Sequence, residues 1–517
     1  MLHHSYRLLH GHRMIRTSLM QWRKMMSSSF IKQTVFRICA ILMVKAIGLI
    51  GRVSLTRLIG AEGIGLFQIA YSYFGLGLML LTGGLPTALA LYTAKHPSQG
   101  WIWFKIFSIY LIIIGGGATT LTFYYSDTVA RMLGNEQLYY FIHFLAPAFF
   151  AVPLLSLLRG YLQGIELYNV IAVSEIIEQA VRVLFMLAIV FLFLPQGPAI
   201  ATGNSMLSTS LGAISAFLVL ISYYLYVNRQ GNQAPIRYSD IKFQKRLKWF
   251  IHSSFIISIT RLLIPLSDVL DAIIIPNRLQ TAGYSSAEAT AMFGVLTGMA
   301  ALVAYMPTLV TAALSHTLTM RMVADWQARN YERFHLRTRI ALKVSWIWGW
   351  ISSLFLYVYN KEISLILFGT IEAARPIQFL FIVPLLVGLR EVSTSILWVQ
   401  EYKKVPLIGL ISGISISLIV HYFLVAKPGL NYRGATVGIL TLEFIAVCCN
   451  LLAMIPMMKR IKWSQLIIDA LVLIFIMFLV NHYTHHSESE IIQIVIGMII
   501  YIGCSLIYAV IRFKSDT

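Results

Sequence analysis

The amino-acid sequence predicts an all-α, polytopic membrane protein with about 14 transmembrane helices. Three observations support this fold class, and two of them concern composition. Of the 517 residues, 58% are hydrophobic and only 12% are charged, whereas soluble domains carry about 25% charged residues. The third is that the hydrophobic residues gather in runs of about 20, the length at which a helix crosses a bilayer. These observations exclude a soluble enzyme.

The apolar runs place the helices in order along the chain. We predict spans over residues 34–56, 63–85, 103–124, 138–162, 170–194, 205–227, 250–275, 290–314, 340–360, 376–398, 405–425, 434–456, 464–482 and 490–511. A basic arm, residues 1–33, precedes the first span, and Met25 or Met26 is an alternative start of the chain.

The net charge of +20, from 41 Lys and Arg against 21 Asp and Glu, is explained by topology. A nucleic-acid partner would require a basic soluble face, and this sequence offers none. With the N-terminus inside, about 26 Lys and Arg fall in cytoplasmic loops and about 7 outside, the asymmetry expected of membrane proteins. We therefore expect both termini in the cytoplasm and the chain in a cell membrane.

A weak internal repeat predicts how the helices are grouped. Sliding the chain by 237 positions superposes four identical residues of spans four and ten: Phe144, Pro147, Ser156 and Gln163 on Phe381, Pro384, Ser393 and Gln400. An offset of six helices predicts two six-helix lobes in the same orientation, facing a central cavity. The predicted parts are the lobes at 34–227 and 250–456, a cytoplasmic loop at 228–249, and two added helices at 464–511.

Several kinds of chemistry are missing from the sequence. No GxxxxGK[ST] phosphate loop is present, so we expect no ATPase activity. The cysteines lie in apolar runs and are interpreted as packing residues, so neither disulfides nor a zinc site is expected: Cys39, Cys448, Cys449 and Cys504. We expect no cofactor, no metal and no catalytic residue.

Three cations lie on one face of the first span, because Arg37, Lys45 and Arg52 are spaced for a helix that turns about 100° per residue. An ionisable residue inside a membrane costs a few kcal/mol and is usually paired or functional. Snorkelling explains Arg37 near the cytoplasmic end but explains Lys45 in mid-span poorly. We therefore predict that Lys45 and Arg52 face the cavity.

Acidic residues in the spans are candidates for ion coupling or ion pairing. Asp268 shares a helix face with Arg261, seven residues earlier, and Asp271 lies beside that face. This arrangement fits either a static pair or a binding group with a releasable counter-ion. Glu178 and Arg182 are four residues apart, which favours an internal ion pair with a structural role.

Glu443, on span twelve, has no local partner and is a candidate proton or cation site. Prolines inside or beside the spans mark helices that can bend, as alternating access requires. They are Pro86, Pro147, Pro153, Pro265, Pro307 and Pro384.

Four groups of residues carry a family resemblance that covers about residues 30–511. They are the stretch Arg57–Phe67, the turn Gly84-Leu-Pro86, the run Arg159–Gly164 followed by Glu175, Glu178 and Arg182, and Arg278–Tyr284 with Ala289–Gly294 and Pro307. These stretches resemble the polysaccharide-biosynthesis exporters of the multidrug, oligosaccharidyl-lipid and polysaccharide exporter superfamily, most closely the stage V sporulation protein B branch.

The resemblance implies a flippase that carries undecaprenyl-pyrophosphate-linked saccharides across the bacterial cytoplasmic membrane. In this branch the implied substrate is the peptidoglycan precursor lipid II, used in spore cortex or cell wall synthesis. It also implies a cationic central cavity and a monomer that works beside cell-wall synthesis enzymes. Carried over by position, the head-group ligands would be Arg52, Arg57 and Arg261, then Lys45 and Arg37.

Other functions stay open on the sequence alone. The chain could export another lipid-linked polysaccharide unit. A drug or cation antiporter of the same superfamily would have twelve spans and a cavity led by carboxylates. A membrane glycosyltransferase would need a large external loop, whereas the external loops here are short. A non-transporting partner in a cell-wall complex is a further alternative.

Overall fold

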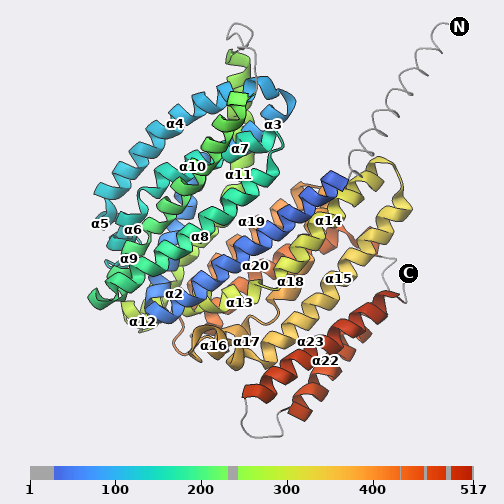
Figure 1. Ribbon diagram of the computed structural model, residues 1–517. Helices are drawn as coiled ribbons and strands as arrows, with labels where there is room; N and C mark the ends of the chain where they lie inside the picture. Colours follow the sequence, from blue (N-terminus) through green and yellow to red (C-terminus); the bar gives the residue numbers. More distant parts are fainter. Residues whose placement is uncertain (1–27, 231–242, 431, 459–462, 485–490, 515–517) are drawn as a thin grey trace, which may run out of the picture. The chain divides into compact units, whose positions relative to one another are not determined.

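The computed structural model describes residues 28–230, 243–430, 432–458, 463–484 and 491–514, and they form helices with short connections and no strand (Figure 1). Most of the predicted basic arm and much of the predicted loop at 228–249 lie outside these residues. The described part of the chain confirms the all-α class.

The first half of the chain contains α2 Ser28–Thr82, α3 Leu85–Lys95, α4 Pro97–Tyr124, α5 Ser126–Met132, α6 Leu138–Leu145, α7 Ala148–Gly164, α8 Tyr168–Phe193, the 3₁₀ turn η1 Leu194–Gln196, α9 Pro198–Ser205, α10 Leu207–Gln230 and α11 Phe243–Thr281. The second half contains α12 Ser286–Phe293, the π-helical η3 Gly294–Ala300, α13 Ala301–Tyr305, α14 Thr308–Gln327, α15 Tyr331–Val358, α16 Asn360–Phe368, α17 Ala374–Phe379, α18 Val383–Val399, α19 Lys404–Leu424, α20 Tyr432–Ala453, α21 Ile455–Met458, α22 Trp463–Thr484 and α23 Ile491–Lys514.

By length and composition, ten of the described helices could cross a membrane, or eleven if the bent pair α6–α7 forms one span. Each of the fourteen predicted spans overlaps a described helix or a run of consecutive helices. The first two spans share α2, which is interrupted at Gly60 with φ 70° and ψ −169°. Only glycine adopts such a conformation without strain, so Gly60 breaks the helix where a loop was expected.

Four of the predicted proline bends coincide with breaks between helices, and the first of them, Pro86, lies in the first turn of α3. Pro147 precedes α7 at a 43° bend from α6, Pro307 precedes α14, and Pro384 lies in the first turn of α18. Proline lacks the amide hydrogen that a helix interior needs, so a helix tends to restart at it. Pro153 and Pro265 instead lie inside α7 and α11.

The chain divides into two compact units. The first unit comprises residues 1–52, 77–126 and 142–262, and the second comprises 53–76, 127–141 and 263–517. Residues 53–76 and 127–141 of the predicted first lobe fall in the second unit, and residues 250–262 of the predicted second lobe fall in the first. The predicted lobe boundaries stay a prediction.

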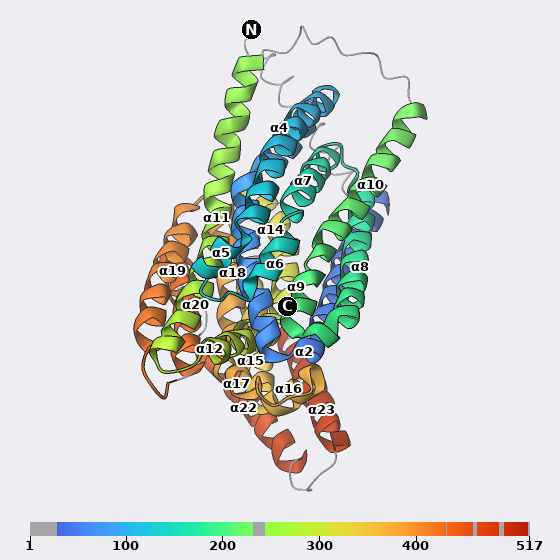
Figure 2. The same cartoon turned by 90° about the vertical axis from the view of Figure 1, so that its left-hand side faces the viewer.

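In the first unit, α7 packs beside α4 and α10, and α10 packs beside α8 (Figure 2). An aromatic and aliphatic core fills this bundle, with Trp103, Phe250 and Leu158 fully buried and Tyr92 nearly so. Polar side chains in this unit form hydrogen bonds with helix backbones. For example, the Ser258 hydroxyl accepts a hydrogen bond from the amide of Gly84 at 2.7 Å.

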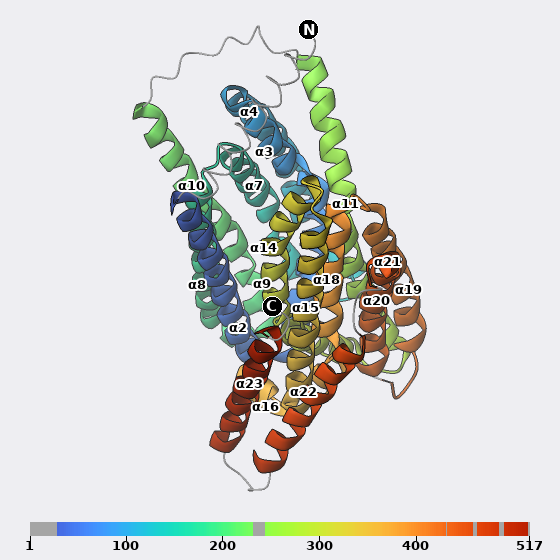
Figure 3. The same cartoon turned by 90° about the vertical axis from the view of Figure 1, so that its right-hand side faces the viewer.

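In the second unit, α14, α15 and α18 pack side by side around Phe334 and Ile396, and α19 lies against α20 (Figure 3). The hairpin of α22 and α23 packs on α15. The Tyr501 hydroxyl donates to the carbonyl of Ile351 at 3.1 Å, and the Trp346 indole donates to the carbonyl of Leu466 at 3.0 Å. These contacts hold α22 and α23 against α15 within the second unit.

Helix starts support an internal repeat. The helices α7, α8 and α9 begin at residues 148, 168 and 198, and α18, α19 and α20 begin at 383, 404 and 432, so the differences are 235, 236 and 234. The helices α7 and α18 both have 17 residues. The offset of 237 predicted from four identities is therefore two residues too long at this pair, because so few matches between apolar helices cannot fix a register.

Both 17-residue helices also end in the same way. Glu166 and Glu401, each two residues past the helix end, adopt left-handed conformations with φ 63° and 67°. In both cases the next amide donates to the carbonyl five residues earlier, at 3.0 and 2.9 Å. This is the Schellman pattern, which usually uses glycine at the left-handed position.

The stretches that carry the family resemblance meet in pairs within each unit. In the second unit, a Cβ added to Gly65 would lie 2.1 Å from the carbonyl oxygen of Thr290. In the first unit, a Cβ added to Gly160 would lie 2.3 Å from the carbonyl oxygen of Pro86. Real side chains do not tolerate such distances, so these motif glycines allow close helix packing.

Candidate functional site

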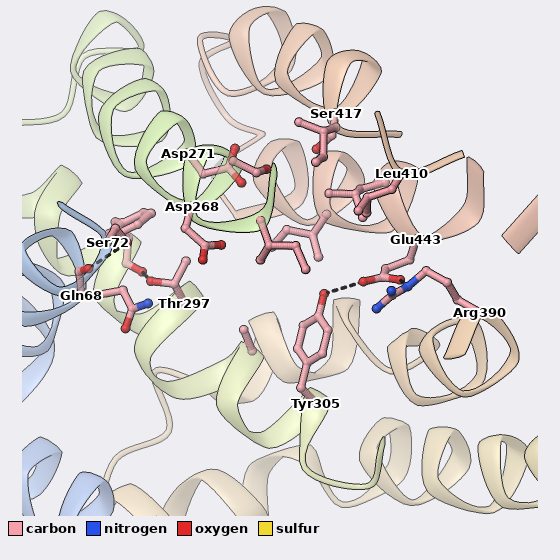
Figure 4. A pocket seen from close by; sticks show the side chains of 17 residues that line it. Gln68, Ser72, Asp268, Asp271, Thr297, Tyr305, Arg390, Leu410, Ser417 and Glu443 are labelled. Atoms are coloured by element: carbon pink, nitrogen blue, oxygen red, sulfur yellow. Dashed lines mark hydrogen bonds and ion pairs between the residues drawn. The ribbon is translucent and has the colours of Figure 1, made fainter. Parts of the chain in front are cut away.

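A cavity of about 390 Å³ lies within the second unit, among α2, α11, α12, η3, α13, α18, α19 and α20 (Figure 4). Its lining is rich in acidic groups: Asp268 and Asp271 come from α11 and Glu443 from α20. Arg390 of α18 is the cation among the described residues that line it. The chemistry of this cavity therefore favours cations or protons.

Glu443 forms hydrogen bonds with side chains of two other helices, α13 and α18. Its side chain is 4% exposed and accepts a hydrogen bond from Nε of Arg390 at 2.6 Å. Its other oxygen accepts from the hydroxyl of Tyr305 at 3.2 Å. Figure 4 shows Tyr305 and Arg390 converging on this carboxylate. Two charge-assisted contacts on a buried acid indicate a structural clamp at this end of the cavity.

Asp271, which lines the cavity, contacts a histidine from α19. The Asp271 carboxylate lies 2.8 Å from Nδ1 of His421, whose side chain is fully buried. The other ring nitrogen, Nε2, lies 3.0 Å from the carbonyl oxygen of Ala435 on α20. The imidazole lies against Gly438, since a Cβ added there would be 2.0 Å from the ring.

Asp268 projects into the cavity near Thr297 and Ser72 (Figure 4). Both hydroxyls donate to backbone carbonyls four residues earlier, Ser72 to Gln68 at 3.0 Å and Thr297 to Phe293 at 2.7 Å. Because their hydrogens are used in this way, their oxygens can offer only lone pairs to the cavity. Asp268 therefore has acceptor groups around it.

The predicted cations are placed elsewhere. None of the five lines this cavity among the described residues. Arg37 lies over the ring of Tyr168, 4.8 Å from its centroid, which favours a cation–π contact inside the first unit. Lys45 and Arg261 are exposed and Arg52 is half-buried, all within the first unit. Their role as head-group ligands stays a prediction, as does the pairing of Arg261 with Asp268.

Arg57 has a contact that the sequence did not reveal. Its Nε donates to the carbonyl of Leu367 at 2.8 Å, and its Nη2 donates to the carbonyl of Ile366. These carbonyls belong to the last turn of α16, where carbonyl groups have no amide partner within the helix. The guanidinium thus caps α16, which favours a structural role for Arg57 in this conformation.

The predicted pair of Glu178 and Arg182 is confirmed. Glu178 also accepts from Nη1 of Arg159 at 2.7 Å, and Arg159 donates to the Ser174 hydroxyl at 3.0 Å. Two arginines around one carboxylate join α7 to α8 inside the first unit. These ion pairs favour a structural role for the motif residues Arg159, Glu178 and Arg182.

Sequence reasoning missed His421, Arg390 and Tyr305 as members of the site. His421 falls inside the predicted span 405–425, so its position as an ionisable residue in a membrane helix was the available signal. Its pairing could not be predicted, because its partner Asp271 is 150 residues away along the chain.

Comparisons with known proteins support the class that this fold defines. Residues 30–286 match the family described as polysaccharide biosynthesis protein. Stage V sporulation protein B of Bacillus subtilis (strain 168) is 25% identical over 480 residues, which cover 91% of this chain and 93% of that protein. Lipid II flippase MurJ of the same organism is 24% identical over 335 residues, or 59% of this chain and 60% of that protein.

The fold also matches a solved structure of lipid II flippase MurJ in an inward closed conformation. The TM-score is 0.69 at 16% identity, and the match covers 93% of this chain and 99% of that chain. The helical fold and the relatives make this chain similar to a group of multi-pass membrane transporters that includes lipid II flippase MurJ. Within it, this chain resembles the polysaccharide biosynthesis exporters, with stage V sporulation protein B among its relatives, so the resemblance predicted from the sequence is confirmed.

Proposed function

We propose that this protein is a flippase that moves an undecaprenyl-pyrophosphate-linked saccharide, the peptidoglycan precursor lipid II, across the bacterial cytoplasmic membrane. The observation that carries this proposal is the similarity along 91% of the chain to stage V sporulation protein B, together with the match to lipid II flippase MurJ. The protein would act in cell wall or spore cortex synthesis. No bond is made or broken in this function, so the protein is a transporter and not an enzyme.

The exposed cations of the first unit support a pyrophosphate ligand. Lys45 and Arg261 are exposed on helices that we predict to cross the membrane. A cation that faces lipid costs a few kcal/mol, so facing a water-filled cavity is the cheaper arrangement. Arginine also binds phosphate oxygens through two parallel hydrogen bonds. Together with Arg52, Lys45 and Arg261 are our candidates for binding the head group.

The mechanism that we propose is alternating access. The inward-open protein would bind the head group and sugars while the polyprenyl tail stays in the bilayer, and the lobes would then open outward. We propose that the protein acts as a monomer with both termini in the cytoplasm. Gly60 and the four proline breaks are places where such a change can occur with little strain.

The test replaces Arg52 or Arg261 by alanine in cells that depend on this protein for lipid II export. Lipid II that becomes accessible to an externally added cleaving enzyme is then quantified by mass spectrometry. We expect loss of accessible lipid II with unchanged membrane insertion. Lys105→Ala on α4 removes an exposed cation outside the candidate set and is the matched control. Wild-type accessibility in both arginine variants would refute these roles.

A second candidate function, a cation antiporter, is favoured by the acidic lining of the cavity in the second unit. Such a transporter would expel a lipophilic cation in exchange for protons or sodium. Everted membrane vesicles loaded with a fluorescent cation distinguish the two functions. Rapid efflux that Asp268→Asn abolishes, without any effect of the arginine variants, would favour the antiporter.

A further inference from the structure

Four cations gather at one end of the second unit, the end that we predict to face the outside of the cell. Three segments meet there: the end of α11, the start of α17 and the loop between α19 and α20. The cations are Arg278, Arg375, Lys427 and Arg433. They are more than half of the roughly seven Lys and Arg expected outside, where membrane proteins usually have few cations. This concentration of charge therefore requires a physical reason.

Hydrogen bonds join the end of α11 to the loop between α19 and α20. Arg278 donates from Nε to the carbonyl of Tyr422 at 2.9 Å, and its guanidinium lies 4.2 Å from the centre of that ring. In the loop, the amide of Leu430 donates to the carbonyl of Lys427 at 3.3 Å, and the amide of Arg433 donates to the carbonyl of Leu430 at 2.9 Å. Lys427 and Arg433 are therefore separated by two tight turns.

The helix α17 is joined to the same group through Arg433. The guanidinium of Arg433 lies 5.3 Å from the centre of the Phe379 ring. Arg375 is four residues before Phe379 on α17, so the two side chains project from the same face of that helix. Arg375, Lys427 and Arg433 are exposed. We refer to these three residues and Arg278 as the external cation patch.

None of the four cations is paired with a carboxylate among the residues that the structure describes. Other arginines form such pairs, as Arg131 does with Asp127. Two carboxylates lie near the patch in sequence. Glu288 accepts hydrogen bonds from Ser285 in the cap of α12, and Glu372 is exposed. Four cations against two carboxylates leave the patch with a net positive charge.

The arginines of the patch keep most of their hydrogen-bond donors available. Within the described chain, Arg278 donates through Nε alone, and Arg433 is held by a ring contact that uses no donor. Contact with an aromatic ring fixes the plane of a guanidinium. The Nη atoms can then donate two parallel hydrogen bonds to one phosphate group. Two oriented guanidinium groups with further cations beside them suit a ligand that carries more than one phosphate.

We propose that the external cation patch binds a diphosphate group, and that during transport this group is the pyrophosphate of the lipid-linked saccharide after it has crossed the membrane. The identity of the lipid rests on the proposed function, whereas the diphosphate site does not. A patch on the outer side can bind the head group only once the protein has opened outward. Binding there would therefore favour the outward-open state while the head group is present.

The diphosphate site is tested on the purified full-length protein in nanodiscs of phosphatidylcholine, with inorganic pyrophosphate as the probe. Hydrogen exchange followed by mass spectrometry reports which segments the probe protects. We expect exchange to slow in α17 and in the loop between α19 and α20 as pyrophosphate is added. The concentration at half-maximal protection gives the apparent affinity. Unchanged exchange in both segments would overturn the site.

Two double variants locate the effect. Arg375→Gln with Lys427→Gln removes two charges from the patch and no side-chain contact that the structure shows, so the fold should be kept. We expect its half-maximal concentration to rise about tenfold or more. Arg131→Gln with Lys361→Gln removes equal charge from exposed residues outside the patch, and the value should stay within about twofold. Equal shifts in the two double variants would overturn the site.

The source of the diphosphate is tested in the same nanodiscs. A small fraction of the phosphatidylcholine is replaced by an undecaprenyl-pyrophosphate-linked saccharide or, in a parallel sample, by the same fraction of phosphatidylglycerol. We expect the lipid-linked saccharide to protect the loop between α19 and α20, and Arg375→Gln with Lys427→Gln to reduce that protection. We expect no protection by phosphatidylglycerol. Equal protection by the two lipids would overturn the assignment to the transported lipid.

These experiments separate the site from the proposed function. If cells that depend on this protein export no lipid II, the proposed function fails, whereas pyrophosphate protection that the patch variant loses still supports the diphosphate site. If lipid II is exported but pyrophosphate protects neither segment, the proposed function stands and the site is wrong.

Discussion

The clamp on Glu443 makes a quantitative prediction about stability. Replacing Glu443 by glutamine keeps the shape of the side chain and removes its charge. The substitution leaves Arg390 without its carboxylate 2.6 Å away and weakens the contact with Tyr305. Removing one partner of a buried ion pair costs about 3–5 kcal/mol.

The structure places this substitution at the lower end of that range. The Arg390 side chain is 23% exposed toward the cavity, so water partly replaces the lost carboxylate. Glutamine also keeps one oxygen that can accept a hydrogen bond. We therefore expect a loss of about 3 kcal/mol, which is a factor of somewhat more than 100 in the unfolding equilibrium.

The measurement is reversible unfolding in mixed micelles by a denaturing detergent, applied to Glu443→Gln, Arg390→Met and the double variant. Because the two residues form one pair, the double variant should be less destabilised than the sum of the single variants. Glu136→Gln, which removes the charge of an exposed glutamate, should change stability by less than about 0.5 kcal/mol. Additive losses, or a loss below about 1 kcal/mol for Glu443→Gln, would refute the clamp.

Three further substitutions test packing and backbone. Gly160→Ala should lower the free energy of unfolding by about 1–3 kcal/mol, because its Cβ would lie 2.3 Å from the α3 backbone. In Gly116→Ala the added Cβ meets no atom within 4 Å, so this control should not be destabilised. Equal shifts of the melting temperature in the two variants would contradict this account. Gly60→Ala should cost about 1–2 kcal/mol through its positive φ, and Gly75→Ala, with open space, should not. Arg57→Met should cost about 1 kcal/mol through the lost cap of α16, and hydrogen exchange should rise in its last turn.

The fold class could be predicted because hydrophobic runs report membrane spans without any knowledge of packing. The pair of Glu178 and Arg182 could be predicted for a similar reason, since helix spacing alone brings the two together. Arg57 could not, because its partners on α16 are more than 300 residues away along the chain.

The acidic cavity was foreseen only in part. Asp268, Asp271 and Glu443 were recognised as costly charges inside spans, and all three line it. The partner of Glu443 is 53 residues away on α18, so inspection of its own helix could not find it. Long-range pairing depends on how helices pack, which helical periodicity does not encode.

The matching helix starts and helix ends of α7 and α18 imply that one ancestral gene segment was doubled. Since then the two copies have acquired different cross-braces. In the first copy the ion pair of Arg159 and Glu178 joins α7 to α8. In the second copy the ion pair of Arg390 and Glu443 joins α18 to α20. The two halves therefore share one backbone plan but differ in which helices an ion pair holds together.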